Sequence, residues 1–243
     1  MWSTTVNIVF SIVFKFYHLI IRLLDFFRFF PVRLGRLIRH VSIGIGQLPK
    51  LNRIHPRQIL FWWLEIVFYV LDLIGITEIV EILNDFIKFN SRPLHGWEID
   101  LAKSVYGKSL NYRRIRIDEY AAFGPKQSRI CYVFGFTINA WGKMHNSLLI
   151  HELTHIWQYQ KIGLVYIPRA LRAYHSEENY NYGGVPKLDR VRQRQGSIWD
   201  FNLEQQGDII ADYYRIKNRH APNWGNGDVS DLALYEYFVQ QLN

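Results

Sequence analysis

The stretch Leu148–Gln160, LLIHELTHIWQYQ, decides how this chain is organised, because it combines a helical pattern of apolar residues with the spacing of metal ligands. His151 and His155 lie four residues apart and therefore share one face of a helix. Two imidazoles in this arrangement can bind one metal ion, and Glu152 can act as a general base towards a water on that ion. The stretch therefore predicts a catalytic metal site on a buried helix.

The alternative is a core helix whose two histidines only form hydrogen bonds with neighbouring carbonyl groups. Nine histidines and ten glutamates among 243 residues give about 0.01 chance matches to this spacing. Burying two histidines and a glutamate without a functional role is also costly. The single cysteine, Cys131, excludes a cysteine-rich zinc site. The sequence therefore favours a metal site of histidine and carboxylate, with zinc as the expected ion, although this ligand set also suits iron or manganese.

A catalytic zinc ion needs a third protein ligand and an open fourth position. The extended pattern with a third histidine is excluded, because Gln158 and Lys161 occupy its glycine and histidine positions. In the later stretch FNLEQQGDIIADYY, Glu204 and Asp208 are four residues apart and can face the same site. We expect Glu204 to bind the metal and Asp208 to accept a hydrogen bond from a ligating histidine.

The order HExxH followed by ExxxD resembles the pattern of the gluzincin metallopeptidases. The resemblance lies within residues 114–215, and the matching residues are His151, Glu152, His155, Glu204 and Asp208. It implies a zinc-dependent metallopeptidase in which a zinc-bound water hydrolyses peptide bonds, with Glu152 as the base.

The chain departs from this family in one spacing, because 48 residues separate His155 from Glu204. Glu177 and Glu178 lie nearer the usual distance, but each is in a loop-like stretch and lacks an aspartate four residues later. We therefore prefer Glu204 as the third ligand and keep the other two as alternatives.

The segments FTIN, LLIHELTHIWQYQ and NLEQQGDIIADYY together are similar to small zinc-peptidase domains encoded with bacterial contractile-injection, type VI secretion and polymorphic-toxin systems. This similarity implies a minimal zincin, with a short β-sheet, the HExxH helix and a ligand-bearing helix. It also implies a secretion-system effector, or a processing or assembly factor. It does not cover the first 90 residues.

The order of predicted elements gives an α+β fold with a boundary near residue 95. Two β-rich runs, YRRIRIDEY (112–120) and RICYVFGFTINAW (129–141), precede the predicted helices at 144–163, 200–219 and 231–242. The segment 174–190 is loop-rich. We expect an apolar, basic helical segment at 1–95 and the zincin-like domain at 96–243.

Two parts of the active site stay open in the sequence. In zincins the strand before the metal helix binds the peptide substrate, and either β-rich run could supply that edge. The donor for the developing oxyanion is also undetermined. The candidates are Tyr180, Tyr182, His175 and Tyr213.

The N-terminal segment carries the whole charge excess of the chain. Residues 1–57 contain nine Lys or Arg and one acid, which gives +8, whereas the other 186 residues contain twenty of each sign. A basic arm that is also apolar indicates an anionic membrane surface or an acidic protein partner rather than nucleic acid.

The pattern in this segment predicts a helix at 4–28 and a second at 56–88, broken near Gly75. Both are apolar around most of their circumference, with one polar stripe. We expect the basic stripe of the first to face Glu65 and Asp72 of the second, leaving apolar surfaces for lipid, a partner or the catalytic domain. Runs of thirteen uncharged residues are too short to cross a membrane unaided, and no cleavable signal peptide is apparent. The expected location is therefore membrane-associated, or that of an exported effector.

Two other functions are compatible with the sequence. The first is a catalytically silent, zinc-stabilised scaffold or interaction protein within a secretion apparatus. The second is a membrane-active toxin in which the N-terminal helices act on the bilayer. Glu152→Gln separates the enzyme from both, because it removes the base and leaves the two histidine ligands.

Overall fold

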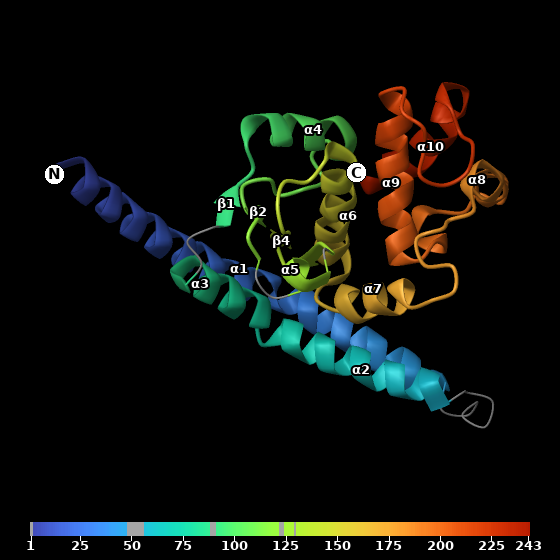
Figure 1. Cartoon of the computed structure of the whole chain (residues 1–243). Coiled ribbons are helices and arrows are strands. Elements are labelled where there is room, and N and C mark those ends of the chain that lie inside the picture. The colour runs from blue at the N-terminus through green and yellow to red at the C-terminus, as the bar shows by residue number, and fades with distance from the viewer. Residues whose placement is uncertain (1, 48–55, 88–90, 122–123, 129) are drawn as a thin grey trace. The chain divides into compact units, whose positions relative to one another are not determined.

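The chain folds into two units, which Figure 1 shows in a computed structural model. The described residues are 2–47, 56–87, 91–121, 124–128 and 130–243. The first unit comprises residues 1–89 with 163–165, and the second comprises residues 90–162 with 166–243. The division falls a few residues before the predicted boundary at 95, because the strand at Ser91–Pro93 pairs within the second unit.

The first unit consists of the helices α1 (Trp2–Gln47), α2 (Pro56–Leu73) and α3 (Ile76–Ile87). Helix α1 extends well beyond the predicted end at residue 28 and continues through Pro31. The break between α2 and α3 lies at Gly75, as predicted, where a φ of 75° is easily adopted only by glycine.

Glu65 and Asp72 do form ion pairs with α1, as expected, but their described partners are not in the predicted basic stripe. Arg22 of that stripe pairs with Glu81 and Asp85 of α3 instead. Arg33 Nε lies 3.5 Å and Arg36 Nη1 3.7 Å from the carboxylate of Asp72. His40 Nδ1 lies 3.4 Å from Glu65. These basic residues lie beyond the helix predicted at 4–28. The prediction therefore named the correct acidic residues but placed their basic partners too early in the sequence.

Among the described residues, no individual helix combines the length and apolar character needed to cross a membrane. Helix α2 and the residues Ile76–Phe86 of α3, bent by 59° at their junction, meet that requirement only as a pair, by length and composition.

The second unit contains a small four-stranded sheet with the order β1-β2-β4-β3. Its strands are β1 (Ser91–Pro93), β2 (Arg116–Asp118), β3 (Tyr132–Phe134) and β4 (Thr137–Asn139). The β2–β4 pair is parallel and the other two pairs are antiparallel. Strand β2 lies between β1 and β4, so the prediction that its run could offer a free edge is wrong. Among the described residues, strand β3 lies at an edge of the sheet.

The second unit combines this small sheet with a larger number of helices, so the fold is α+β, as predicted. They are α4 (Gly96–Tyr106), α5 (Pro125–Ser128), α6 (Asn146–Ile162), α7 (Tyr166–Tyr174), α8 (Gly184–Gln193), α9 (Leu203–Lys217) and α10 (Leu232–Val239), with short 3-10 turns at Ile198–Asp200, Val229–Asp231 and Gln240–Leu242. The predicted helices correspond to α6, α9 and α10. Helices α4 and α7 were not predicted, and α8 begins inside the segment predicted as loop.

Helix α6 lies at the centre of the second unit, with the sheet on one side and α9 on the other (Figure 1). Its side chains Leu153, Ile156 and Trp157 are fully buried, and each such side chain contributes about 1.5–3 kcal/mol or more by leaving water. Trp157 Nε1 also donates to the carbonyl oxygen of Leu242, 2.9 Å away. The helix that carries the two histidines is therefore held on both faces.

Candidate metal centre

Three buried side chains converge between α6 and α9. His151, His155 and Glu204 each offer a ligand atom, and these atoms lie within 4.8 Å of one another. Oε2 of Glu204 is 3.4 Å from Nε2 of His151 and 3.5 Å from Nε2 of His155. One small cation could therefore be bound by all three residues, which are the ligands expected from the sequence.

The start of α9 fixes the position of Glu204. The side chain of Asn202 caps this helix by accepting a hydrogen bond from the backbone N–H of Gln205, at 2.8 Å. Oε1 of Gln205 in turn accepts a hydrogen bond from the backbone N–H of Asn202, which completes a capping box. Glu204 lies in this first turn, so its carboxylate is carried by a well-ordered helix end.

A glycine allows α9 to approach α6 closely. A Cβ atom on Gly207 would lie 2.5 Å from Cε1 of His151, far inside van der Waals contact. Glycine is unfavourable inside a helix by about 1 kcal/mol relative to alanine. Its presence here is explained by the space that the imidazole of His151 requires.

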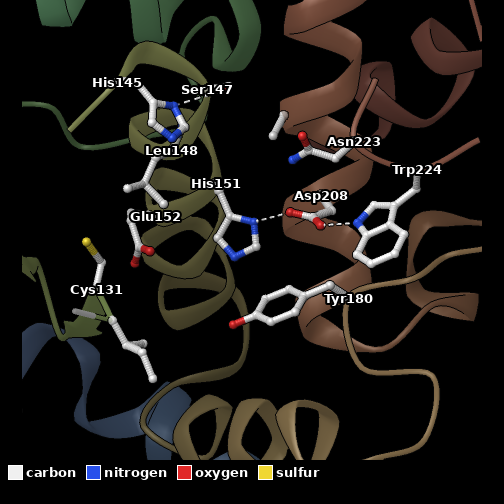
Figure 2. A pocket seen from close by; sticks show the side chains of 12 residues that line it. Cys131, His145, Ser147, Leu148, His151, Glu152, Tyr180, Asp208, Asn223 and Trp224 are labelled. Atoms are coloured by element: carbon white, nitrogen blue, oxygen red, sulfur yellow. Dashed lines mark hydrogen bonds and ion pairs between the residues drawn. The ribbon is translucent and has the colours of Figure 1, made fainter. Parts of the chain in front are cut away.

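Asp208 holds His151 from the side away from Glu204. Nδ1 of His151 lies 2.8 Å from Oδ1 of Asp208, and the indole N–H of Trp224 donates to the other oxygen of the same carboxylate (Figure 2). In the neutral imidazole with Nδ1 donating to Asp208, Nε2 of His151 carries the lone pair and faces Glu204. This is the arrangement expected from the four-residue spacing of Glu204 and Asp208.

Gln158 plays the corresponding part for His155, and the sequence reasoning missed it. Oε1 of Gln158 lies 2.8 Å from Nδ1 of His155. The amide nitrogen of Gln158 donates to the carbonyl of Leu203 at 2.9 Å and to Oε1 of Gln206 at 3.0 Å, so the amide orientation is fixed by α9. A polar residue three positions after a ligand on a buried helix was the available signal.

The three carboxylates around the two imidazoles favour positive charge at this site. Burial alone would lower the pKa of His151, but hydrogen bonds with Asp208 and Glu204 outweigh it and raise that pKa well above its usual value. The pKa of His155 is raised as well, since the charge of Glu204 outweighs burial. For Glu204 itself, burial is outweighed by the two histidines, and its pKa is lowered.

Glu152 is buried beside these residues, and its carboxylate is incompletely satisfied. Its Oε2 atom has no hydrogen-bond partner among the described residues. Burial raises the pKa of Glu152, although the two histidines oppose the shift. A buried carboxylate oxygen without a partner costs stability. This unpartnered oxygen, together with the Nε2 atoms of His151 and His155, fits the expectation of a metal ion with a water beside Glu152.

A cavity of about 490 Å³ opens onto the site (Figure 2). Its lining residues are Ile130, Cys131, His145, Ser147, Leu148, His151, Glu152, Tyr180, Asp208, Ala211, Asn223 and Trp224. Figure 2 shows His151 and Glu152 projecting from α6 into this space, with Cys131 facing Glu152 and Tyr180 lying on the other side. The cavity therefore connects the candidate base and one histidine with the surface.

Of the four candidates for the oxyanion donor, Tyr180 is the one that lines this cavity. Its ring centroid lies 5.7 Å from that of His151. Tyr182 is fully buried and hydrogen-bonded in the core, and Tyr213 Oη accepts a hydrogen bond from a lysine. His175 is exposed, and its Nδ1 lies 2.8 Å from a backbone carbonyl.

The two alternative third ligands lie elsewhere. Glu177 and Glu178 are exposed, and the structure does not group either of them with the two histidines among the described residues. The carboxylate of Glu178 accepts a hydrogen bond from Gln205 at 3.0 Å and pairs with Lys187 at 3.3 Å.

Comparison with known proteins gives one informative similarity. No family model matches the chain, and no solved structure matches it. The chain is 31% identical over 142 residues to the type VI secretion system spike protein VgrG2b of Pseudomonas aeruginosa strain PAO1. The match covers 52% of this chain and 13% of that protein. The similarity therefore links part of the chain to a protein of a secretion system, and the chain spans only a small fraction of that relative's length.

Proposed function

We propose that this protein is a zinc-dependent metallopeptidase of the minimal zincin type, related in its ligand pattern to the gluzincins. The observation that carries the proposal is the buried carboxylate oxygen of Glu152, which has no hydrogen-bond partner among the described residues and lies beside the group of His151, His155 and Glu204. A helix with only a structural role would gain stability from a neutral or apolar residue at this position.

His151, His155 and Glu204 would hold the ion, and Asp208 and Gln158 would keep both imidazoles in the required tautomer. When bound, zinc would acidify a coordinated water and polarise the scissile carbonyl. The raised pKa of Glu152, which results from burial, suits a group that takes a proton from the attacking water and later delivers it to the leaving amine.

Tyr180 would donate its phenolic hydrogen to the developing oxyanion. Its position in the cavity beside His151 supports this role. Burial and the nearby charges of Glu204 and Glu152 raise the pKa of Tyr180, so the hydroxyl keeps its proton at neutral pH.

An extended peptide is the substrate that the surroundings favour. Strand β3 pairs with β4 on one side and is an edge strand among the described residues. Ile130 and Cys131, which directly precede β3, line the cavity. A peptide added to this edge would receive backbone hydrogen bonds independent of its sequence, and its scissile bond would lie near Glu152.

The experiment that tests the proposal measures metal content and peptide hydrolysis on the same full-length proteins. We expect about one zinc per chain, by mass spectrometry, in the wild type, in Glu152→Gln and in the exposed control Glu177→Ala, and little in His151→Ala or Glu204→Ala. Cleavage of a mixed peptide library should occur in the wild type and the control. It should fall by at least about 10²-fold in Glu152→Gln.

Each other outcome identifies a different function. Zinc in the wild type without cleavage of any peptide would favour a zinc-stabilised scaffold. If the protein keeps its activity on cells in the variant Glu152→Gln, which lacks the base, a toxin whose first-unit helices act on the bilayer would be favoured. No metal in any sample after zinc is added back would leave α6 as a core helix.

We further propose that the peptidase acts in connection with a bacterial type VI secretion system, as an exported effector or a processing factor. The similarity to the spike protein VgrG2b supports this connection.

A further inference from the structure

The three helices of the first unit have their ionic side chains directed towards one another and their apolar side chains outward. Helix α3 illustrates the pattern: Glu78 and Glu81 are 4% and 3% exposed, whereas Ile79, Leu83 and Phe86 are 47%, 51% and 43% exposed. Both sets recur every three or four residues, so each forms one face. The amphipathic pattern of this helix is therefore the reverse of that in a helix of a water-soluble protein.

Helix α1 supplies the basic partners of these acids. Arg22, which is 6% exposed, forms ion pairs with Glu81 at 3.1 Å and with Asp85. Arg33, which is 4% exposed, pairs with Glu78 and with Asp72 of α2. A seam of buried ion pairs therefore runs between α1 and the pair of α2 and α3, which follow each other along α1 in Figure 1.

Helix α2 follows the same rule. Its buried residues are Glu65, Tyr69 and Asp72, which are spaced by four and three. On its outward face Leu60 and Trp63 are 72% and 57% exposed.

The outward surface of this unit is apolar over all three helices and the turn between α2 and α3. Among the described residues, large exposed apolar side chains number 21 in this unit and eight in the second unit, which has more residues. The 21 are Phe16, Ile20, Leu23, Leu24, Phe27, Phe29, Phe30, Val32, Leu34, Ile38, Ile43, Ile45, Leu60, Trp63, Leu64, Val67, Val70, Ile74, Ile79, Leu83 and Phe86. A monomer in water rarely exposes a contiguous apolar surface of this extent.

We propose that the first unit binds a lipid bilayer, with these outward side chains in contact with the acyl chains and the ion pairs enclosed between the helices. Charged residues at membrane depth face the interior of a bundle and pair with one another, as Arg22 and Arg33 do here. This proposal is independent of the peptidase activity.

Two observations favour lipid over a protein partner. A protein partner of ordinary size covers one patch of about 800 Å², whereas apolar side chains here face outward from every helix. The exposed basic residues Arg28 and Arg39 lie on α1 of the same unit, within residues 1–57, whose net charge is +8. Anionic phospholipid headgroups complement both features.

The test uses the full-length chain carrying Glu152→Gln and vesicles of phosphatidylcholine with or without phosphatidylglycerol. We expect the protein to float with the vesicles that contain phosphatidylglycerol and to stay bound in 1 M NaCl, because apolar contacts are not screened by salt. The double variant Val67→Ser/Leu83→Ser should reduce the partition coefficient about tenfold or more. The matched control Leu171→Ser/Val229→Ser alters two side chains of the second unit with nearly the same exposure and should leave it unchanged.

Three results would overturn the proposal. The first is that the protein floats with neither type of vesicle, and the second is that 1 M NaCl releases it completely. The third result is a fall in the partition coefficient of the control variant as large as that of Val67→Ser/Leu83→Ser. Light scattering on protein that does not float would then tell whether a second copy of the chain covers the apolar surface. Thermal melts of all three proteins ensure that a loss of binding is not a loss of folding.

Discussion

At the scale of single residues, the candidate site depends on groups that hold other groups in place. Asp208 and Gln158 each occupy Nδ1 of one histidine, so that both Nε2 atoms face Glu204. Such contacts usually change metal affinity by 10- to 100-fold without touching the ion.

Gln158→Leu should lower zinc affinity by about 10- to 100-fold, because His155 would lose the acceptor that fixes its ring. A competition titration with a chromophoric chelator measures this change. Gln160→Leu is the matched control on the same helix. Gln160 accepts a hydrogen bond from the backbone N–H of Asn111 and donates one to the carbonyl of Ser109, so its partners lie in the segment after α4 and not at the histidines. Equal affinities for both variants would contradict a role for Gln158.

Tyr180→Phe should lower kcat by about 10²-fold or more and leave KM and zinc content nearly unchanged, because it removes one donor to the oxyanion and retains the ring. Steady-state kinetics on a single peptide gives both parameters. The control is Tyr213→Phe. The hydroxyl of Tyr213 accepts a hydrogen bond from Lys217 and does not line the cavity, so this variant should keep kcat. A rise in KM at constant kcat would instead make Tyr180 a substrate-binding residue.

At the scale of elements, the site is made by the close approach of α9 to α6. Glu204, Gly207 and Asp208 occupy successive positions on one face of α9, and Gly207 lies where that face meets the ring of His151. The distance between the two helices is therefore set by a residue without a side chain.

Gly207→Ala should lower zinc content and stability even though alanine favours helix by about 1 kcal/mol, because the new methyl group would displace His151. The control is Gly35→Ala, a helical glycine of α1 with no atom near the position of the added Cβ. That substitution should stabilise the protein by about 0.5–1 kcal/mol. Chemical denaturation and metal analysis of the two variants give the comparison.

At the scale of the whole molecule, stability should depend on pH through Asp212. Burial raises the pKa of Asp212 to about 6, although hydrogen bonds from the backbone of Asn223, from Tyr182 and from the backbone of Trp224 oppose the shift. A carboxyl group with a raised pKa stabilises the fold while it is protonated. Its contribution is complete below about pH 4 and is lost as pH rises through about 6.

We therefore expect the unfolding free energy of the wild type to lose up to about 3 kcal/mol between pH 4 and pH 7 relative to Asp212→Asn, which does not titrate. Urea denaturation of both proteins across this range measures the difference. Parallel curves for the two proteins would show that Asp212 titrates as in the unfolded chain.

The sequence predicted those features that depend on spacing within one element. The four-residue separations of His151 from His155 and of Glu204 from Asp208 determine which side chains share a helix face, whatever surrounds them. The three-residue spacing of Gln158 from His155 was a signal in the sequence, but the orientation of its amide depends on which groups of α9 lie opposite and could not be predicted. Strands of three residues and the helix that begins at Gly184 are stabilised by tertiary contacts and leave little periodicity in the sequence.

Trp224 takes part in two hydrogen-bond groups at once. Its indole N–H donates to Asp208 beside His151, and its backbone N–H donates to the buried carboxylate of Asp212, one helical turn further along α9. During evolution, a substitution at this position would have to satisfy a geometric demand from the cavity and another from the core. Changes that retune the surroundings of His151 are therefore expected to arise elsewhere on the cavity wall, where a side chain has a single set of neighbours.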